Sequence, residues 1–322
     1  MKHLAQLVIA FMLVSIASSE RTFAAKKVKE TMVMAFFRDN GQAGVYMASS
    51  DDGLNFTPLN NDQPVMKPAP WEGQNLTRDP SVVYHDGLFH MVWTTSWKGN
   101  CFAYARSKDL VNWSEPVRVE PFPADIKPGN TWAPEICWDP YQKNFMIFWS
   151  SVVNPKRKQQ IFVTRTTDGI TFSEAHLFLD RNYSCIDGMV ALDKKNKRWL
   201  IIYKNEEKEE NGGKNLRVAT SPLDFSKPWE DLGKPVVGPG TSINSESMVE
   251  GPSLLRAKKG WDLYWDSPLI KSYGMAISSG LKDWESRSSE LNLPKNLRHG
   301  TVFKAPASAI GWLKKADYLT AP

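Results

Sequence analysis

Five polar residues stand at the same place in a repeated sequence pattern. Each comes directly before a short apolar run, and the five are Asp79, Glu135, Asp187, Glu250 and His299. If they meet at one axis, their like charges raise one another's pKa, which makes an acid available near neutral pH. Two carboxyl groups in different environments can then act as general acid and general base, the chemistry of glycoside hydrolysis. Alternatively, each acid caps its strand by accepting backbone N–H groups. A purely structural cap would not need to be an acid at all four positions, which argues against this alternative.

The apolar runs that follow these residues have the pattern of β-hairpins. After Asp79, two such runs flank Asp86-Gly87, and Asp-Gly between apolar runs is a strong hairpin signal. Two runs and a turn also follow each of the other three acids, whereas one run follows His299. The missing second run lies near the start of the chain, at 32–37. We therefore expect the strand 301–304 to pair with 32–37 and close a ring of five units.

A further strand, a polar turn and an aromatic residue follow each second run. The aromatic residues are Phe56, Trp113, Phe172, Trp229 and Trp284. The unit repeats every 55–60 residues, roughly, which is typical of propellers and solenoids and leaves room for four strands per unit. The sequence predicts an all-β, five-bladed β-propeller closed by pairing of its N- and C-terminal strands. A β-sandwich with similar hairpins is the alternative, and five copies in one order argue against it.

The first 25 residues have the pattern of an export signal. A basic start at Lys2 and His3 precedes a short apolar stretch, and small residues around Ala17 and Ser19 offer a cleavage site. An uncleaved membrane anchor is the alternative. We expect residues 1–25 to be a signal peptide, residues 26–322 to form a single propeller catalytic domain, and the mature protein to be secreted or periplasmic and off the membrane.

Charge and cysteine content exclude some classes of protein. The net charge is +5, but no basic stripe interleaved with aromatic residues indicates nucleic-acid binding. The three cysteines, Cys101, Cys137 and Cys185, form neither a disulfide framework nor a zinc pattern. Cys137 and Cys185 lie on or beside adjacent predicted inner strands, so a disulfide between them and two buried free thiols both stay open.

The segments around the five polar residues resemble those of glycoside hydrolase family 43. They are 78–81 (Arg-Asp-Pro-Ser), 132–135 (Trp-Ala-Pro-Glu), 186–188 (Ile-Asp-Gly), 250–252 (Glu-Gly-Pro) and 298–300 (Arg-His-Gly). Members of that family are five-bladed propellers that cleave glycosidic bonds with inversion. The resemblance implies that Asp79 is the general base, that Glu250 is the general acid, and that Asp187 orients Glu250 and tunes its pKa.

The resemblance also suggests roles for two further residues. His299 matches a histidine near the channel axis that often lies close to a bound ion or water, commonly calcium. We therefore expect no required cofactor and consider a structural Ca²⁺ near the axis, held by His299 through water. Glu135 matches a position that is structural or contacts substrate.

Aromatic and basic residues near these segments are candidate substrate contacts. Trp97 and Trp132 could stack on the C–H faces of a sugar, or could pack between blades. Arg78, Arg217 and Arg298 could bind a substrate or a phosphate, or could pair with nearby acids. The tryptophans inside apolar runs, Trp93, Trp149 and Trp265, are assigned to the core.

Together these features predict a secreted, monomeric, exo-acting glycosidase. The expected substrate is a terminal L-arabinofuranose or a similar sugar on a plant-type oligosaccharide or polysaccharide. A propeller glycoside phosphorylase and a non-catalytic glycan-binding propeller are the alternatives. An enzyme that cleaves sucrose or fructan fits less well, because Gly251 rather than cysteine follows Glu250.

Overall fold

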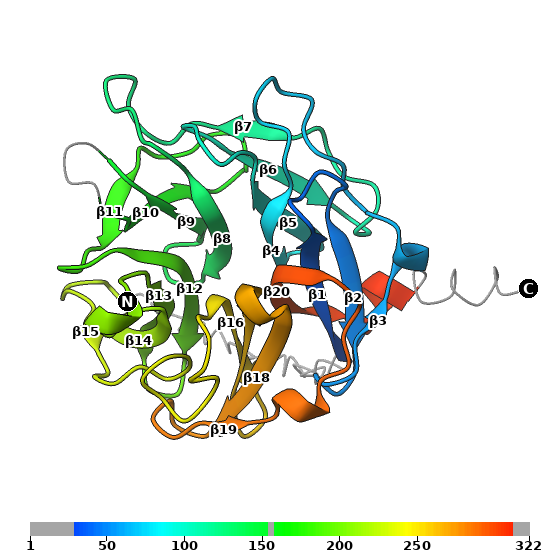
Figure 1. Cartoon of the computed structure of the whole chain (residues 1–322). Coiled ribbons are helices and arrows are strands. Elements are labelled where there is room, and N and C mark those ends of the chain that lie inside the picture. The colour runs from blue at the N-terminus through cyan, green and yellow to red at the C-terminus, as the bar shows by residue number, and fades with distance from the viewer. Residues whose placement is uncertain (1–28, 154–157, 312–322) are drawn as a thin grey trace, which may run out of the picture.

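The computed structural model describes residues 29–153 and 158–311. Its strands form five four-stranded antiparallel sheets arranged around a central axis (Figure 1). Each sheet is one propeller blade, and its strands follow one another from the axis outward in chain order, apart from the blade that contains both ends of the described chain. The predicted all-β five-bladed propeller is therefore confirmed.

Each blade has an innermost strand at the axis and three further strands that lie progressively outward. Blade 1 consists, in this order, of β20 (Leu297–Pro306), β1 (Glu30–Arg38), β2 (Tyr46–Ser50) and β3 (Thr57–Pro58). Blade 2 consists of β4 (Arg78–His85), β5 (Leu88–Thr94), β6 (Phe102–Ser107) and β7 (Val117–Val119). Blade 3 consists of β8 (Trp132–Asp139), β9 (Asn144–Ser151), β10 (Gln160–Thr166) and β11 (His176–Leu179). Blade 4 consists of β12 (Cys185–Asp193), β13 (Arg198–Asn205), β14 (Asn215–Pro222) and β15 (Glu230–Asp231). Blade 5 consists of β16 (Glu250–Ala257), β17 (Gly260–Ser267), β18 (Ser272–Ser278) and β19 (Glu285–Ser286). Short 3₁₀ turns lie at η1 (Asn60–Asp62), η2 (Glu209–Asn211), η3 (Pro268–Ile270) and η4 (Ser288–Glu290).

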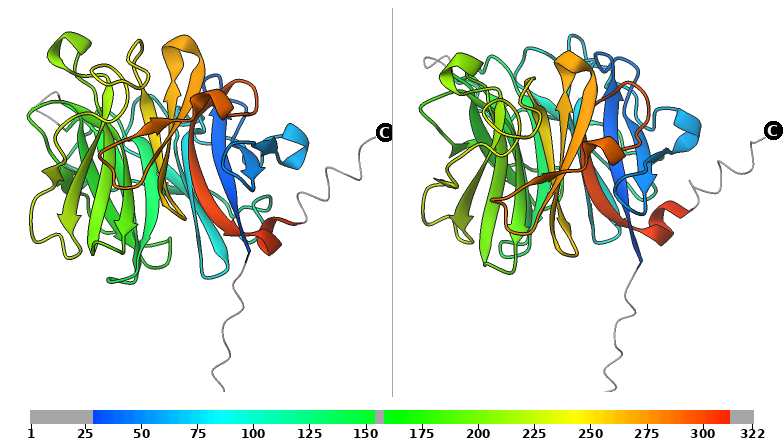
Figure 2. Two further views of the ribbon diagram at one scale, coloured as in Figure 1. Left: turned by 90° about the horizontal axis from the view of Figure 1, so that it is seen from below. Right: turned by 60° about the horizontal axis from the view of Figure 1, so that its bottom comes forward.

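The first and last strands, β1 and β20, close the ring as the sequence predicts. Strand β20 pairs antiparallel with β1, with Val302 opposite Met34 and Lys304 opposite Met32. The other end of this ladder joins Leu297 to Arg38, at the face where every innermost strand begins. We call this face the mouth. Figure 2 shows that β1 starts and β20 ends on the opposite face.

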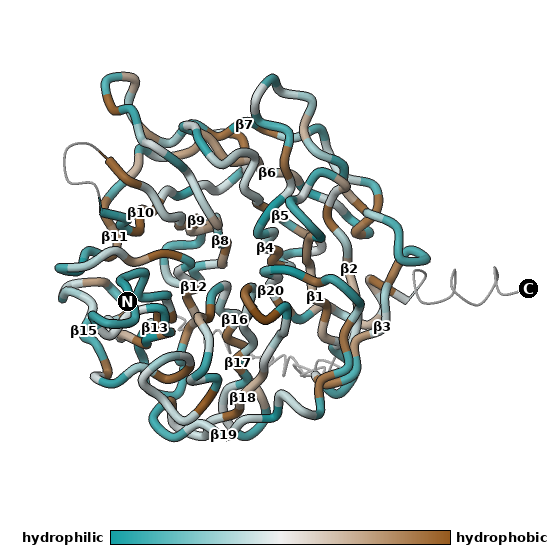
Figure 3. The backbone as a smooth tube through the Cα atoms, in the orientation of Figure 1, coloured by the Kyte–Doolittle hydropathy of each residue, from teal (hydrophilic) through white to brown (hydrophobic). Residues whose placement is uncertain are grey.

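The core is divided among the five seams between neighbouring blades. One apolar cluster lies at each seam, as where Met91 and Trp93 of blade 2 pack on Val33 and Phe303 of blade 1. Four tryptophans, Trp93, Trp149, Trp199 and Trp265, are completely buried in such clusters. Hydrophobic stretches follow the strands, while many outer loops are hydrophilic (Figure 3). Each blade therefore buries its faces against its two neighbours.

The polar turn predicted after the third strand has a specific structure in four blades. The hydroxyl groups of Ser50, Ser107, Thr166 and Ser278 each accept the backbone N–H of the residue three positions later. This bond turns the chain toward the outermost strand.

The structure also bears on the predicted termini and thiols. The proposed signal peptide, residues 1–25, lies outside the described residues. In the part of the chain that the structure describes, no helix is long and apolar enough to cross a membrane. Cys101, Cys137 and Cys185 are all free thiols, so Cys137 and Cys185 do not form a disulfide.

Candidate active site

A β-bulge lies near the mouth end of every innermost strand. In blade 2, Arg78 pairs with Thr94 and Ser81 with Val92, so one extra residue stands on the inner strand. The same shift occurs in blades 3, 4, 5 and 1. A bulge re-aims the side chains around it and is frequent next to active sites. In this propeller it divides the channel into layers.

The bulge separates residues that the sequence pattern treats as equivalent. In each innermost strand, one residue at the mouth is paired with the second strand directly before the bulge. The residue that follows this paired residue is Asp79 in β4, Asp187 in β12 and His299 in β20. Glu250 is one position earlier, as the paired residue itself. Glu135 is two positions later, deeper in the channel. The expectation of one ring of five residues is therefore corrected to three layers.

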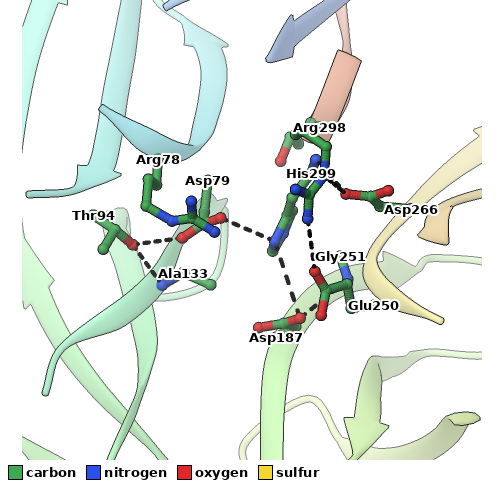
Figure 4. A network of polar contacts seen from close by, with 12 residues as sticks. Arg78, Asp79, Thr94, Ala133, Asp187, Glu250, Gly251, Asp266, Arg298 and His299 are labelled. Atoms are coloured by element: carbon green, nitrogen blue, oxygen red, sulfur yellow. Dashed lines mark hydrogen bonds and ion pairs between the residues drawn. The ribbon is translucent and has the colours of Figure 1, made fainter. Parts of the chain in front are cut away.

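His299 lies between two of the predicted catalytic carboxyl groups. Its Nδ1 is 3.2 Å from Oδ1 of Asp79 and 4.0 Å from Oδ2 of Asp187 (Figure 4). All three side chains are buried. Burial alone would lower the pKa of His299, but the charges of Asp79 and Asp187 outweigh it and raise that pKa to about 10. His299 is thus an imidazolium that holds two carboxyl groups from different blades.

The two aspartates have opposite pKa shifts. Burial would raise the pKa of Asp79, but His299 and a hydrogen bond from Thr94 Oγ1, at 2.9 Å, bring it to about 2. At Asp187 burial prevails over the opposing charge of His299, and the nearby Glu250 adds to it, so the pKa rises to about 6. Asp79 is therefore ionised at any physiological pH, whereas Asp187 takes up a proton in mildly acidic solution.

Glu250 lies in a network of cations at the mouth. Its Oε1 is 3.3 Å from Nη2 of Arg298 and its Oε2 is 3.1 Å from Nζ of Lys204. Asp266 Oδ2 in turn accepts Nε of Arg298 at 2.7 Å (Figure 4). These contacts fix the position of the Glu250 carboxyl group, one residue away from the layer that contains Asp79 and Asp187.

Backbone hydrogen bonds between blades set the positions of the bulged residues. The side chains of Thr94, Ser150 and Asp266 accept the N–H groups of Ala133, Asp187 and His299, respectively. In blade 4 the equivalent residue is Lys204, an ammonium that cannot accept a hydrogen bond. There, Oδ2 of Asp187 accepts the N–H of Gly251 at 3.1 Å instead. Asp187 is thereby tied to the residue that follows Glu250.

Glu135 bridges two other blades below this layer. Its Oε2 accepts Ser81 Oγ at 2.5 Å and its Oε1 accepts Thr301 Oγ1 at 2.8 Å. Burial raises the pKa of Glu135 to about 7, although both hydroxyl groups favour the charged form. Because Ser81 lies two residues after Asp79 and Thr301 two after His299, Glu135 connects the strands that carry that ion pair.

Aromatic residues hold Arg78 at the rim. The guanidinium carbon of Arg78 lies 4.1 Å from the ring centre of Trp97 and 4.6 Å from that of Phe37. Asn40 Oδ1 accepts both Nη1 of Arg78 and Nε1 of Trp97. No carboxylate of the described residues is within ion-pair distance of Arg78. Its charge is therefore not neutralised by a direct partner.

The other predicted substrate contacts have different surroundings. Trp97 is 50% exposed, and Trp132 packs edge-on against it and donates Nε1 to its carbonyl oxygen. Arg298 pairs with acids, as the alternative interpretation expected. Arg217 is not part of this cluster, because it contacts the Gly233 carbonyl and approaches Asp231 beside the outermost strand of blade 4.

Three residues of the site, Lys204, Asp266 and Thr94, escaped the sequence analysis. Each stands at the mouth end of a second strand, directly opposite the residue before the bulge. The sequence did hold a signal for these residues, because each is a polar residue at the end of a long apolar strand, as in Trp265-Asp266.

The residues around His299 do not fit a directly bound metal ion. No group of three or more His, Cys, Asp or Glu side chains within 29–153 and 158–311 has the arrangement of a metal site. The imidazolium form of His299 has no lone pair to offer and already supplies the positive charge between Asp79 and Asp187. A Ca²⁺ ion held through water stays an expectation, and the proposed reaction does not depend on it.

The sequence matches a known protein family and is similar to a known protein. Residues 29–308 match a family related to glycoside hydrolase family 43 and described as a probable glycosyl hydrolase domain. An α-L-arabinofuranosidase of Bifidobacterium longum subsp. longum is 23% identical over 92% of the chain. The chain spans only 35% of that relative's length.

Solved structures share the fold. A thermostable family-43 glycoside hydrolase superposes with a TM-score of 0.53 and 18% identity, over 65% of this chain and 71% of that one. An α-L-arabinofuranosidase from Lactobacillus brevis has a TM-score of 0.52 and 16% identity, over 66% and 72%. An arabinanase from Bacillus subtilis has a TM-score of 0.52 and 15% identity, over 72% and 81%.

Proposed function

The chain belongs to the family described as a probable glycosyl hydrolase domain, and from this premise we propose that it is an inverting, exo-acting glycosidase. Its substrate would be a terminal L-arabinofuranose or a similar furanoside or pentoside on an oligosaccharide or polysaccharide. The enzyme would act as an exported monomer, in the periplasm or outside the cell, and would require no cofactor.

The observation that carries this proposal is the grouping of three carboxyl groups at one mouth. Asp79 and Asp187 flank His299, and Asp187 accepts a hydrogen bond from the backbone N–H of Gly251, the residue after Glu250. The three carboxyl groups have different neighbours, which is the condition for dividing acid and base roles between them. A purely structural cap would accept backbone N–H groups. Asp187 accepts one, from Gly251, but the contacts of Asp79 are side chains.

In the proposed reaction Asp79 is the general base. Its pKa of about 2 keeps it ionised, and Thr94 and His299 hold its two oxygens. It would accept a proton from a water molecule as that water attacks the anomeric carbon. Because so low a pKa makes a weak base, we expect proton transfer to accompany formation of the new C–O bond rather than precede it.

Glu250 is the proposed general acid. Arg298 and Lys204 orient its carboxyl group, which would protonate the departing glycosidic oxygen. Asp187, whose pKa of about 6 allows it to hold a proton in mildly acidic solution, would modulate the proton affinity of Glu250 through their mutual repulsion. As the water and the leaving group would lie on opposite sides of the sugar, the product would have inverted configuration.

The choice of sugar is supported by the similar proteins. The Bifidobacterium longum relative and the Lactobacillus brevis enzyme are both α-L-arabinofuranosidases. The half-exposed Trp97 at the rim, with Trp132 against its edge, offers an aromatic surface to a sugar. Arg78, which has no carboxylate partner among the described residues, favours a glycoside phosphorylase as the second candidate, since phosphate would need such a cation.

A panel of nitrophenyl glycosides, assayed with and without phosphate, tests the proposal. We expect the α-L-arabinofuranoside to be hydrolysed faster than the xyloside or the galactofuranoside, without phosphate. Cleavage that depends on phosphate would identify a phosphorylase. Binding without release from any member of the panel would identify a non-catalytic glycan-binding propeller.

A further inference from the structure

A cavity of about 690 Å³ opens at the mouth beside the candidate active site. One wall is the connection between β17 and β18, which includes Pro268 and Lys271. The other is the segment 291–298, which leads into β20. Ligand sites typically have volumes of about 300–1,000 Å³, so the cavity has room for a short oligosaccharide.

Arg298 connects this cavity to the reacting groups. Its side chain lines the cavity, and its Nη2 donates to Oε1 of Glu250 at 3.3 Å. Asp79 lies on the other side of His299, on β4 of blade 2 (Figure 4). In an inverting displacement the acid is on the leaving-group side and the base on the side of the attacking water. The leaving group therefore departs on the side of Glu250, where this cavity begins.

The charges of the cavity wall indicate what the leaving group contains. Lys271 and Lys295 both line the cavity, and within the described chain neither ammonium has a carboxylate at ion-pair distance. Asp39 is the one acid among the described residues of the wall. The cavity thus has two cations that are free to meet an acidic ligand.

We propose that this cavity binds the leaving-group part of the substrate, and that this part is a saccharide with carboxylate groups, such as a chain of uronic acids. The inference rests on the proposed function, because it takes Glu250 as the general acid. Leu291, Leu293 and Pro294 supply apolar surface for the C–H faces of the sugars, while Lys271 and Lys295 bind their carboxylates. The specificity of the enzyme then depends on two parts of the substrate: the terminal sugar that is removed, and the acidic chain to which that sugar was attached.

Calorimetric titration with trigalacturonate tests the proposal, with xylotriose as the neutral probe. We expect trigalacturonate to bind more tightly than xylotriose and to lose affinity as salt is added, because screening weakens exposed ion pairs. The double variant Lys271→Gln/Lys295→Gln should weaken binding of trigalacturonate by about 10-fold and leave that of xylotriose unchanged. The double variant Lys194→Gln/Lys195→Gln removes the same charge at the hairpin on the opposite face and should bind like the wild type.

Three outcomes would overturn the inference: equal binding of the two probes, no binding of trigalacturonate, or an equal loss in both double variants. Because the titration does not involve turnover, it separates this inference from the proposed function. Hydrolysis of the nitrophenyl panel without binding of trigalacturonate contradicts the cavity assignment alone. Binding of trigalacturonate with no cleavage of any glycoside contradicts the proposed function.

Discussion

At the scale of single residues, the site separates three carboxyl groups by their immediate partners. Asp79 has an imidazolium and a hydroxyl group, Asp187 has a backbone N–H and the edge of the same imidazolium, and Glu250 has two cations. Such differences in surroundings allow similar side chains to act as base, modulator and acid. Asp79 and Glu250, the two residues proposed to carry the reaction, can be distinguished by mutation.

The first prediction concerns Glu250 and Asp79. Glu250→Ala should cripple cleavage of natural linkages, by about 10²–10⁴-fold, yet spare much of the activity on a nitrophenyl glycoside, whose leaving group departs without protonation. Asp79→Ala should reduce both activities alike, because every substrate needs the activated water. The measurement is kcat/KM on an arabinose-containing oligosaccharide and on the nitrophenyl glycoside. If Asp79→Ala spares the activated substrate and Glu250→Ala does not, the two roles have been exchanged.

The second prediction concerns Glu135, whose pKa rises from 4.5 to about 7 on burial. Between these values the folded protein holds a proton that the unfolded chain has lost, so stability falls as the pH rises from 4.5 to 7. The variant Glu135→Gln removes this loss. The melting temperature of the variant minus that of the wild type should therefore increase as the pH rises from 4.5 to 7.

Thermal unfolding followed at several pH values makes the comparison. Glu120→Gln, at an exposed carboxyl group paired with Arg118, is the control and should run parallel to the wild type. Parallel curves for Glu135→Gln and the wild type would show that Glu135 keeps an ordinary pKa in the folded protein.

At the scale of elements, the bulge in each innermost strand is the device that places the site. It gives positive φ angles to Asp79, Ala133, Asp187 and Gly251, with values of 49°, 46°, 52° and 57°. Strain of this kind at non-glycine residues is kept where the surroundings enforce it, often at functional sites. At Gly251 there is a second constraint, since a Cβ atom would lie 2.5 Å from the ring of His299.

The third prediction follows from that contact. Gly251→Ala should displace His299 from Asp79 and reduce kcat by about 10²-fold or more, because small misplacements of catalytic groups have effects of that size. Gly87, in the first hairpin turn, also has a positive φ of 82° but open space around it. Gly87→Ala should therefore destabilise by about 1–2 kcal/mol and leave kcat unchanged. Similar kcat values for the two variants would show that the imidazole position is not critical.

The element scale also shows what the sequence pattern could predict. Each hairpin and its turn were predictable, because apolar runs and turn residues are local signals. The three layers of polar residues in the channel were not predictable, because a bulge changes the strand register without changing the apolar run that follows it. Glu135 and Glu250 look alike in sequence, but one lies three positions deeper in its strand than the other. Lys204 and Asp266 were missed because the residues through which they join the site, Glu250 and Arg298, lie on other blades.

At the scale of the whole molecule, the closing blade joins the first and last strands of the described chain. Ring closure was predictable from the unpaired half-unit at each end, and the β20–β1 ladder confirms it. His299 and Arg298 lie on β20, so closure also completes the site. The cluster of Asp79, Asp187, Glu250 and His299 exists only in the closed ring.

The fourth prediction tests this closure. Deletion of residues 297–322 should expose the edge of β1 and yield insoluble protein or a markedly lower melting temperature. Two substitutions on β20 provide a matched pair. Val302→Asp places a charge at a position that is 1% exposed and should destabilise strongly. Lys304→Gln, at an exposed position, loses only the hydrogen bond from Lys304 Nζ to the Arg256 carbonyl oxygen and should cost about 1 kcal/mol. A soluble truncation with an unchanged melting temperature would contradict the closing role of β20.

The central claim is that Asp79 and Glu250 hydrolyse a glycosidic bond by a single displacement with inversion. A proton NMR time course with the wild-type protein and a nitrophenyl α-L-arabinofuranoside tests it most directly. The account predicts that β-L-arabinofuranose appears first and that the other anomer forms later by mutarotation. Initial release of the α anomer would show retention and contradict the account.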